Sequence, residues 1–269
     1  MPNSRIPMLK RSILWLCVLT LLIGLTYYYD KSLFTDGWDA IATSSAKREL
    51  PIYCVKTDKP QVAISFDAAW GNDDTRKILD TLKKYKIKTT FFMTGGWVKE
   101  YPDDVKAICN EGHDLGNHSE NHKHMSQLSS PEISEELNKV TQKVKDLTGV
   151  TMSLFRPPYG EYDNQVITQA KACGYYPIQW SVDSLDWKNY GVNSIIDTIL
   201  NHKDLKNGAI ILMHNGAKYT AEALPKVIEG LKEKGFEIVP ISQLIYKENY
   251  HIEPDGSQVS DSGVEETTK

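Results

Sequence analysis

The chain has 269 residues, of which 41% are apolar and 25% are charged, with a formal net charge of −4 and a pI near 6.0. This length and apolar content are sufficient for one well-packed domain with short extensions. The small acidic excess excludes the concentrated basic face that nucleic-acid binding requires, so we expect no nucleic-acid partner.

The N-terminal segment has the charge and hydropathy pattern of a membrane anchor. Arg5, Lys10 and Arg11 precede an apolar run at 13–29. This run is near the lower length limit for a membrane-spanning helix and is longer than most cleaved signal cores. Because the basic residues precede it, we expect a single-pass protein of the cell membrane whose main domain lies outside the cytoplasm. If the segment is instead a cleaved signal peptide, the domain is secreted.

After a polar, irregular stretch that ends at Pro60, apolar runs rich in β-forming residues alternate with segments of helical periodicity. Ser130 is the expected N-cap of the longest helix, with Pro131 at its first helical position. We predict strands at 62–66, 89–93, 113–117, 153–155, 176–180, 209–213 and 236–239, and helices at 74–85, 98–110, 130–147, 164–173, 193–202, 221–234 and 241–246.

This alternation is typical of a parallel β/α architecture, either an open doubly wound sheet or a barrel. Polar residues follow the C-terminal ends of several strands. An open sheet brings only the strand ends beside a switch point together, whereas a barrel brings all of them to one mouth. We therefore predict an α/β fold of the distorted (β/α)7–8 barrel type. The residues at the strand ends are Asp67, Asn117, His118, Arg156, Asp183 and His214.

Any one of these polar residues is more often a helix cap, an ion pair or a hydrogen-bonded core group than a functional residue. Their occurrence together on one rim favours a site. His118 and His122 are four residues apart, a spacing that allows two imidazoles to bind one metal ion. The spacing alone is weak evidence, because such pairs are also common on exposed turns.

Five short motifs occur in a fixed order between Val62 and Ile245. They resemble those of the polysaccharide deacetylase family, the NodB-type enzymes of carbohydrate esterase family 4. The resemblance implies a NodB-type fold and a hydrolase that cleaves the linear amide bonds of N-acetylated glycans. The motifs are Ser65-Phe66-Asp67, His118-Ser119-Glu120-Asn121-His122, Arg156-Pro157-Pro158-Tyr159, Asp183-Ser184-Leu185-Asp186-Trp187 and Leu212-Met213-His214.

The resemblance also implies a role for each matching residue. His118 and His122 would bind one divalent metal, Zn²⁺ or sometimes Co²⁺, together with a carboxylate. Asp67 would be the general base and His214 the general acid. Supporting roles would belong to Arg156, which holds Asp67 ionised, to Asp186, which orients His214, and to Tyr159, whose backbone N–H binds the oxyanion. The substrate groove would include Trp187, Pro157 and Leu212.

The first motif departs from the family pattern at Ala68, where similar enzymes carry a second aspartate that binds the metal. Alanine has no ligand atom, so the third ligand must come from elsewhere or be missing. Asp73 and Asp74 follow on the same loop. We expect Asp73 to supply the ligand, because Asp74 is well placed as the N-cap of the next helix. A two-histidine site completed by water and a domain without metal or catalysis are the alternatives.

These features divide the chain into five predicted segments. They are a cytoplasmic N-terminus at 1–12, a transmembrane anchor at 13–30, a stalk at 31–60, a deacetylase-like domain at 61–247 and a polar disordered tail at 248–269.

Two functions fit this organisation. The first is a metal-dependent deacetylase that releases acetate from an extracellular N-acetylated glycan. The membrane anchor favours peptidoglycan, at either its N-acetylglucosamine or its N-acetylmuramic acid. The second is a non-catalytic protein that binds the cell wall, which the loss of a carboxylate at Ala68 motivates. In both cases we expect a monomer whose partners are the glycan and the membrane.

Overall fold

The structure, a computed structural model, describes residues 19–21, 25 and 48–263. The chain divides into two compact units, Met1–Arg48 and Glu49–Lys269. Among the described residues, no helix is long and apolar enough to cross a membrane. Nearly all of the anchor expected at 13–30 lies outside the described residues, as do the cytoplasmic segment at 1–12 and the first part of the stalk.

The second unit is built on a parallel sheet. Every pair of neighbouring strands in it runs parallel. Its strands are β2 (Gln61–Ala68), β3 (Thr90–Met93), β4 (Asp114–Asn117), β5 (Leu154–Phe155), β6 (Tyr176–Pro177), β7 (Val182–Asp183), β8 (Ile210–His214) and β9 (Glu237–Ile238). Their order is β6-β5-β4-β3-β2-β8-β7, with β9 pairing with β2 outside this path. The strand β2 is central and almost entirely buried, as expected for a parallel strand covered on both faces.

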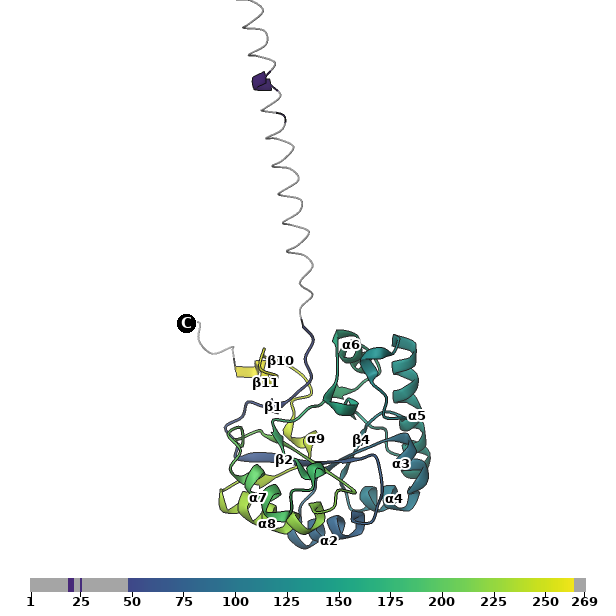
Figure 1. Cartoon of the computed structure of the whole chain (residues 1–269), viewed down its shortest axis with the longest axis vertical. Coiled ribbons are helices and arrows are strands. Elements are labelled where there is room, and N and C mark those ends of the chain that lie inside the picture. Colours follow the sequence, from purple (N-terminus) through teal and green to yellow (C-terminus); the bar gives the residue numbers. More distant parts are fainter. Residues whose placement is uncertain (1–18, 22–24, 26–47, 264–269) are drawn as a thin grey trace, which may run out of the picture. The chain divides into compact units, whose positions relative to one another are not determined.

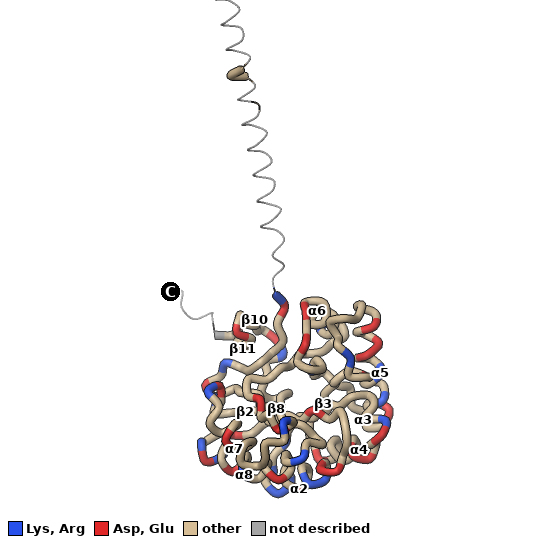
Figure 2. The backbone as a smooth tube through the Cα atoms, viewed as in Figure 1, with Lys and Arg blue, Asp and Glu red and all other residues tan. Residues whose placement is uncertain are grey.

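Amphipathic helices cover the outer face of this sheet (Figure 1). On the first of them, Ile78, Leu79 and Leu82 form one buried stripe against the sheet. Lys and Arg are interspersed with Asp and Glu over the solvent side of the helices (Figure 2). The helices on this face are α2 (Thr75–Tyr85), α3 (Gly95–Glu100), α4 (Pro102–Asn110), α5 (Ser130–Thr148), α6 (Asn164–Ala172), α7 (Val192–Leu200) and α8 (Thr220–Glu233). The short helix α9 (Ile241–Leu244) packs against the opposite face, in a cluster with Ala63 and Ile210.

The sheet is curled into a half-barrel, so the expected barrel of seven or eight strands is corrected. Its edge strands are β6 and β7, which only residues 178–181 separate in the chain. Parallel neighbours need a crossover of about a dozen residues, which this short link does not supply. An extended segment fills the gap: Ile52 N–H donates to Pro177 O and Val55 N–H donates to Gly208 O, both at 2.9 Å.

Strands also occur in both segments that were predicted to be irregular. The strands β1 (Cys54–Val55), β10 (Tyr250–Ile252) and β11 (Ser257–Ser260) form a second sheet in the order β1-β11-β10. The prediction of a disordered tail at 248–269 is therefore wrong for most of that segment. The stalk predicted at 31–60 overlaps the compact second unit, which begins at Glu49. Cys54 pairs with Ser257, 203 positions away, and local periodicity does not reveal such a pairing.

Two helix boundaries differ from the prediction. The helix expected at 98–110 is two helices, α3 and α4, which break at Tyr101 because Pro102 begins the second one. The N-cap of α5 is Ser129 rather than Ser130. A capping box explains the shift, since Glu132 accepts from Ser129 N–H at 2.8 Å. Pro131 thus lies in the first turn, one position later than expected.

Candidate functional site

The sequence motifs converge on a cavity of about 530 Å³ at the C-terminal ends of the strands. A larger hollow of about 920 Å³, beside Lys56, Lys206 and Tyr246, contains none of the motif residues. The candidate site is therefore the smaller cavity. Its lining residues are Asp67, Trp70, His118, His122, Tyr159, Gly160, Trp180, Asp183, Trp187, Leu212 and His214.

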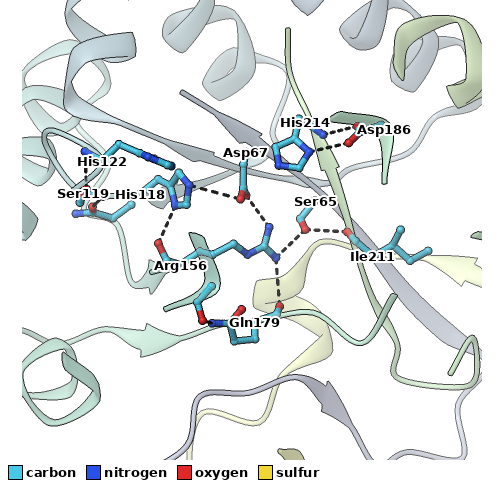
Figure 3. Close-up of polar contacts among 12 residues, drawn as sticks. Ser65, Asp67, His118, Ser119, His122, Arg156, Gln179, Asp186, Ile211 and His214 are labelled. Carbon is cyan, nitrogen blue, oxygen red and sulfur yellow. Dashed lines mark hydrogen bonds and ion pairs between the residues drawn. The ribbon is translucent and has the colours of Figure 1, made fainter. Parts of the chain in front are cut away.

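At the floor of the site, the strand β2 presents a buried carboxylate to a buried guanidinium (Figure 3). Arg156, which follows β5, donates through Nη1 to Asp67 Oδ1 at 2.7 Å and through Nη2 to Ser65 Oγ at 2.8 Å. Ser65 in turn donates to Ile211 O on β8 at 2.9 Å. Ser65 and Asp67 share one face of the strand because side chains alternate with a period of two. The guanidinium therefore fixes the carboxylate in position.

This environment sets the charge of Asp67. Burial alone would raise the pKa of the carboxyl group, but the positive charge of Arg156, helped by His118 and His214, more than offsets that effect. The pKa of Asp67 is consequently held below its ordinary value. The carboxylate is ionised at neutral pH and can accept a proton.

The two histidines of the second motif lie together on one side of Asp67 (Figure 3). The ring centroids of His118 and His122 are 4.9 Å apart. His118 Nδ1 lies 2.7 Å from Arg156 O, and His118 Nε2 lies 3.5 Å from Asp67 Oδ2. Donation from Nδ1 to the carbonyl leaves the Nε2 lone pair directed toward the cavity.

Both histidines are suited to metal binding by their charge state. Burial lowers the pKa of His118, and it lowers the pKa of His122 to about 4. Neutral imidazole is the form that binds a metal ion. The donor set is incomplete, because the described residues contain no group of three His, Cys, Asp or Glu side chains placed to hold a metal. What is present fits a two-histidine site whose remaining positions are open to water.

The expected third ligand is not brought to the histidines. Asp73 is exposed and is not among the residues that line the cavity. Ala68 is fully buried in the apolar core. Asp74 occupies the N-cap position of α2 without capping the helix, because its Oδ1 accepts from Gly216 N–H at 2.8 Å. The loop after β2 is thereby held against the turn that follows β8.

On the other side of Asp67, a carboxylate holds the histidine at the end of β8 (Figure 3). His214 Nδ1 lies 2.7 Å from Asp186 Oδ1, and Asp186 Oδ2 accepts from His214 N–H at 2.7 Å and from Thr220 Oγ1 at 2.6 Å. Burial opposes protonation of His214, but Asp186 outweighs burial and raises its pKa above the ordinary value. The ring of Trp70 stacks on His214 with centroids 5.8 Å apart. His214 is thus an oriented imidazole whose protonated form persists to a higher pH than that of an ordinary histidine.

The remaining candidates occupy different positions around the cavity. Trp187 and Leu212 line it, whereas Pro157 is buried and does not. Tyr159 has a left-handed backbone, with φ of 60°, and its ring packs between those of His122 and His124 at centroid distances of 4.5 and 4.4 Å. Of the three residues expected in the substrate groove, two therefore line the cavity.

Sequence reasoning missed several residues that position the site. Ser65 connects Arg156 to β8, and Thr220 adds a hydrogen bond to Asp186. The signal for Ser65 was present, since it precedes Asp67 by two positions on the same strand and so shares its face. Thr220 begins α8 and has no such local signal.

A curled parallel sheet that brings a carboxylate with a lowered pKa and a histidine with a raised pKa to one cavity is typical of a hydrolytic enzyme domain of the α/β class. Residues 55–178 match the model of the polysaccharide deacetylase family. The chain belongs to the polysaccharide deacetylase family, whose active members hydrolyse N-acetyl amide bonds.

Two relatives from Bacillus subtilis illustrate the range of proteins that the chain resembles. The uncharacterized protein YlxY is 38% identical over 195 residues, which cover 72% of this chain and 60% of YlxY. The peptidoglycan-N-acetylmuramic acid deacetylase PdaA is 34% identical over 204 residues, covering 74% of this chain and 77% of PdaA. The structure of PdaA superposes with a TM-score of 0.68, over 72% of this chain and 84% of that one. The match to YlxY thus spans less than two thirds of that protein.

A third similar protein is described as inactive. BA3943 of Bacillus anthracis, a pseudoenzyme of carbohydrate esterase family 4, is 36% identical, with a TM-score of 0.69 over 72% of this chain and 68% of its own. A mutant of BA3943 is described as having restored enzymatic activity. The proteins that this chain resembles thus include both a named deacetylase and a pseudoenzyme.

Proposed function

We propose that the protein is a metal-dependent deacetylase that removes N-acetyl groups from an extracellular glycan and releases acetate. The substrate we favour is peptidoglycan, at its N-acetylglucosamine or N-acetylmuramic acid residues. Support comes from PdaA, which carries the name of a peptidoglycan deacetylase. The protein acts as a monomer outside the cytoplasm, held to the cell membrane by the segment at 13–30, or secreted if that segment is cleaved.

The observation that carries this proposal is that two groups facing one cavity have pKa values shifted in opposite directions. Arg156 lowers the pKa of Asp67, and Asp186 raises the pKa of His214. Environments that push the pKa values of two titratable groups apart are how an enzyme assigns its base and its acid. Asp67 is accordingly the general base and His214 the general acid.

The cavity residues divide the reaction between its two sides. Asp67 Oδ2 accepts the proton of the attacking water, while Arg156 keeps the carboxylate in place. His214 gives its proton to the departing amine nitrogen, and Asp186 holds the ring with its donor nitrogen toward the cavity. Trp70, Tyr159 and Trp187 surround the opening with aromatic surface suited to sugar rings.

His118 and His122 are the residues that would hold a divalent ion, Zn²⁺ or alternatively Co²⁺. When bound, such an ion lowers the pKa of a coordinated water and polarises the acetamide carbonyl. Because the described residues add no third ligand, we expect the metal to bind less tightly here than in a site with a carboxylate.

One observation favours a second function, a non-catalytic cell-wall-binding protein. Ala68 cannot ligate a metal, and the similar protein BA3943 is described as a pseudoenzyme. Such a protein would keep the aromatic opening and bind glycan without releasing acetate.

Acetate release separates the two functions. The full-length protein is incubated with N-acetylated peptidoglycan without added metal, with Zn²⁺ and with Co²⁺, beside Asp67→Asn and His118→Ala variants. The deacetylase proposal predicts metal-stimulated acetate release that falls by about 100-fold or more in Asp67→Asn. No acetate with any metal, combined with retained glycan binding, supports the binding protein instead. Full activity in His118→Ala contradicts the assignment of the metal site.

A further inference from the structure

Beyond the catalytic cavity, an aromatic and basic surface continues along the loop after β7. Trp187 and Tyr190 are 49% and 68% exposed, although large aromatic side chains are usually buried. On the described part of the second unit, the other exposed large hydrophobic side chains are Trp70, Val150 and Tyr159. All of these except Val150 are aromatic, and Trp70, Tyr159 and Trp187 line the cavity, whereas Tyr190 lies outside it. The exposed aromatic surface thus continues past the cavity as far as Tyr190.

The ammonium group of Lys188 lies near both exposed rings of this loop. Its Nζ lies 5.1 Å from the ring centroid of Trp187 and 6.0 Å from that of Tyr190. Within the described part of the chain, Lys188 is exposed and forms no ion pair with a carboxylate. One ammonium group, without an acidic partner, therefore lies between two aromatic faces at the edge of the cavity.

Hydrogen bonds join this loop to His214 at the end of β8. Leu185, Asn189 and Gly191 have left-handed backbones, and Lys188 N–H donates to Leu185 O at 3.1 Å. Asp186 Oδ1 accepts from Trp187 N–H at 2.9 Å and also contacts His214 Nδ1 at 2.7 Å. The carboxylate that orients His214 therefore also holds the backbone of Trp187 in this aromatic surface.

We propose that Trp187, Lys188 and Tyr190 form a subsite for the sugar next to the one that is deacetylated, and that Lys188 selects glycans in which this neighbouring sugar carries a carboxylate. The aromatic rings contact the apolar faces of the sugars, and the ammonium pairs with the acidic substituent. This inference rests on the proposed glycan substrate and narrows it to an acidic, polymeric glycan.

Binding to two hexasaccharides tests the subsite without requiring catalysis. The first is a neutral N-acetylglucosamine hexamer. The second is a peptide-free hexamer of alternating N-acetylglucosamine and N-acetylmuramic acid, in which every second sugar carries a carboxylate. Calorimetric titration gives the Kd of each for the full-length protein and for Lys188→Gln and Tyr190→Ala variants. The matched control is Lys84→Gln, since Lys84 is an exposed lysine 5.4 Å from the ring of Tyr85 and does not line the cavity.

The two variants have distinct expected results. Lys188→Gln raises the Kd of the acidic hexamer by about threefold, the scale of an exposed ion pair, and leaves the neutral hexamer unchanged. Added salt reduces the preference for the acidic hexamer. Tyr190→Ala raises the Kd of both hexamers on the order of fivefold, because it removes aromatic contact area. Lys84→Gln changes neither value.

Equal effects of Lys188→Gln on both hexamers, or no effect of Tyr190→Ala, would overturn the subsite. Both side chains are exposed, so these variants keep the packed core, and unfolding curves of each variant check this. If this binding pattern appears but no acetate is released with any metal, the deacetylase proposal fails and the subsite is retained. If acetate is released but this binding pattern is absent, the subsite is refuted and the deacetylase proposal is retained.

Discussion

Arg156 Nη1 lies 2.7 Å from Asp67 Oδ1, and both side chains are almost completely buried. The two residues are 89 positions apart in the chain, and the curl of the sheet from β2 through β3 and β4 to β5, which Arg156 follows, brings them together. A protein tolerates the loss of both partners of such a buried ion pair better than the loss of one, because removal of one partner leaves the other as an unpaired buried charge. The pair is therefore the most sensitive point of the site.

Arg156→Gln is expected to destabilise the protein by about 3 kcal/mol, because Asp67 is left as a buried charge without its partner. The folded-state pKa of Asp67 lies below the ordinary value of 3.8, so its stabilising contribution is present above about pH 4 and is lost as pH falls through the folded value. The variant should therefore lose stability at neutral pH. Urea unfolding at pH 7 measures this, and the double variant Asp67→Asn/Arg156→Gln should recover part of the loss. A double variant that is no more stable than Arg156→Gln would contradict this account.

Asp186→Asn is expected to lower the pKa of His214 and to reduce acetate release by about 100-fold. With Asp186 present, the pKa of His214 lies above 6.5, so the protonated acid persists above that pH and is lost as pH rises through the raised value. In the variant, the alkaline limb of the pH profile should move to lower pH. NMR titration of the His214 ring measures the shift even if no acetate is released. Thr220→Val, which removes only one hydrogen bond to Asp186, should cause a smaller shift in the same direction.

Ala68→Asp introduces a carboxylate at the position where similar enzymes carry a metal-binding aspartate, and we expect it to add a ligand to the donor set of His118 and His122. The affinity for Zn²⁺ should rise on the order of tenfold, equivalent to about 1.4 kcal/mol, with a parallel increase in metal-stimulated acetate release. Competition with a zinc indicator measures the affinity. Ala69→Asp is the matched control, because it adds the same charge one position further along the loop. Equal gains in both variants would indicate a general electrostatic effect rather than a new ligand.

Truncation after Lys247 is expected to destabilise the folded domain by about 2 kcal/mol or more, because it removes β10 and β11. Gln258 is fully buried, and its side chain accepts from Tyr246 N–H at 2.9 Å while donating to Tyr246 O at 2.6 Å. Thermal unfolding compares the truncated and full chains. Gln258→Ala should reproduce part of the loss, and unchanged stability in both would show that this sheet is dispensable.

Much of the fold was predictable because it depends on local patterns. The predicted strand at 62–66 lies within β2, and the predicted helix at 164–173 closely matches α6. The motif residues that the structure gathers around one cavity include Asp67, His118 and His214, as the argument from strand ends predicts. In a curled parallel sheet, the C-terminal ends of the strands meet on one side. Residues that directly follow the strands in the sequence therefore come together in the fold.

Other features depend on contacts that no local pattern records. The open edges of the sheet, the segment at Ile52 that fills the gap and the pairing of Cys54 with Ser257 all join distant parts of the chain. Asp73 is adjacent to the site in sequence, yet its side chain is exposed and outside the cavity.

The sequence by itself determined the family, the motif residues and the gap at Ala68, because these are properties of residue identity and order. The tertiary structure decided which carboxylate faces which imidazole and which segment fills the gap between the edge strands of the sheet. Those outcomes are set by packing, since burial and neighbouring charges exist only once the chain is folded. The same packing carries Asp186 into contact with both His214 and Trp187, and so joins the histidine at the end of β8 to the exposed aromatic surface.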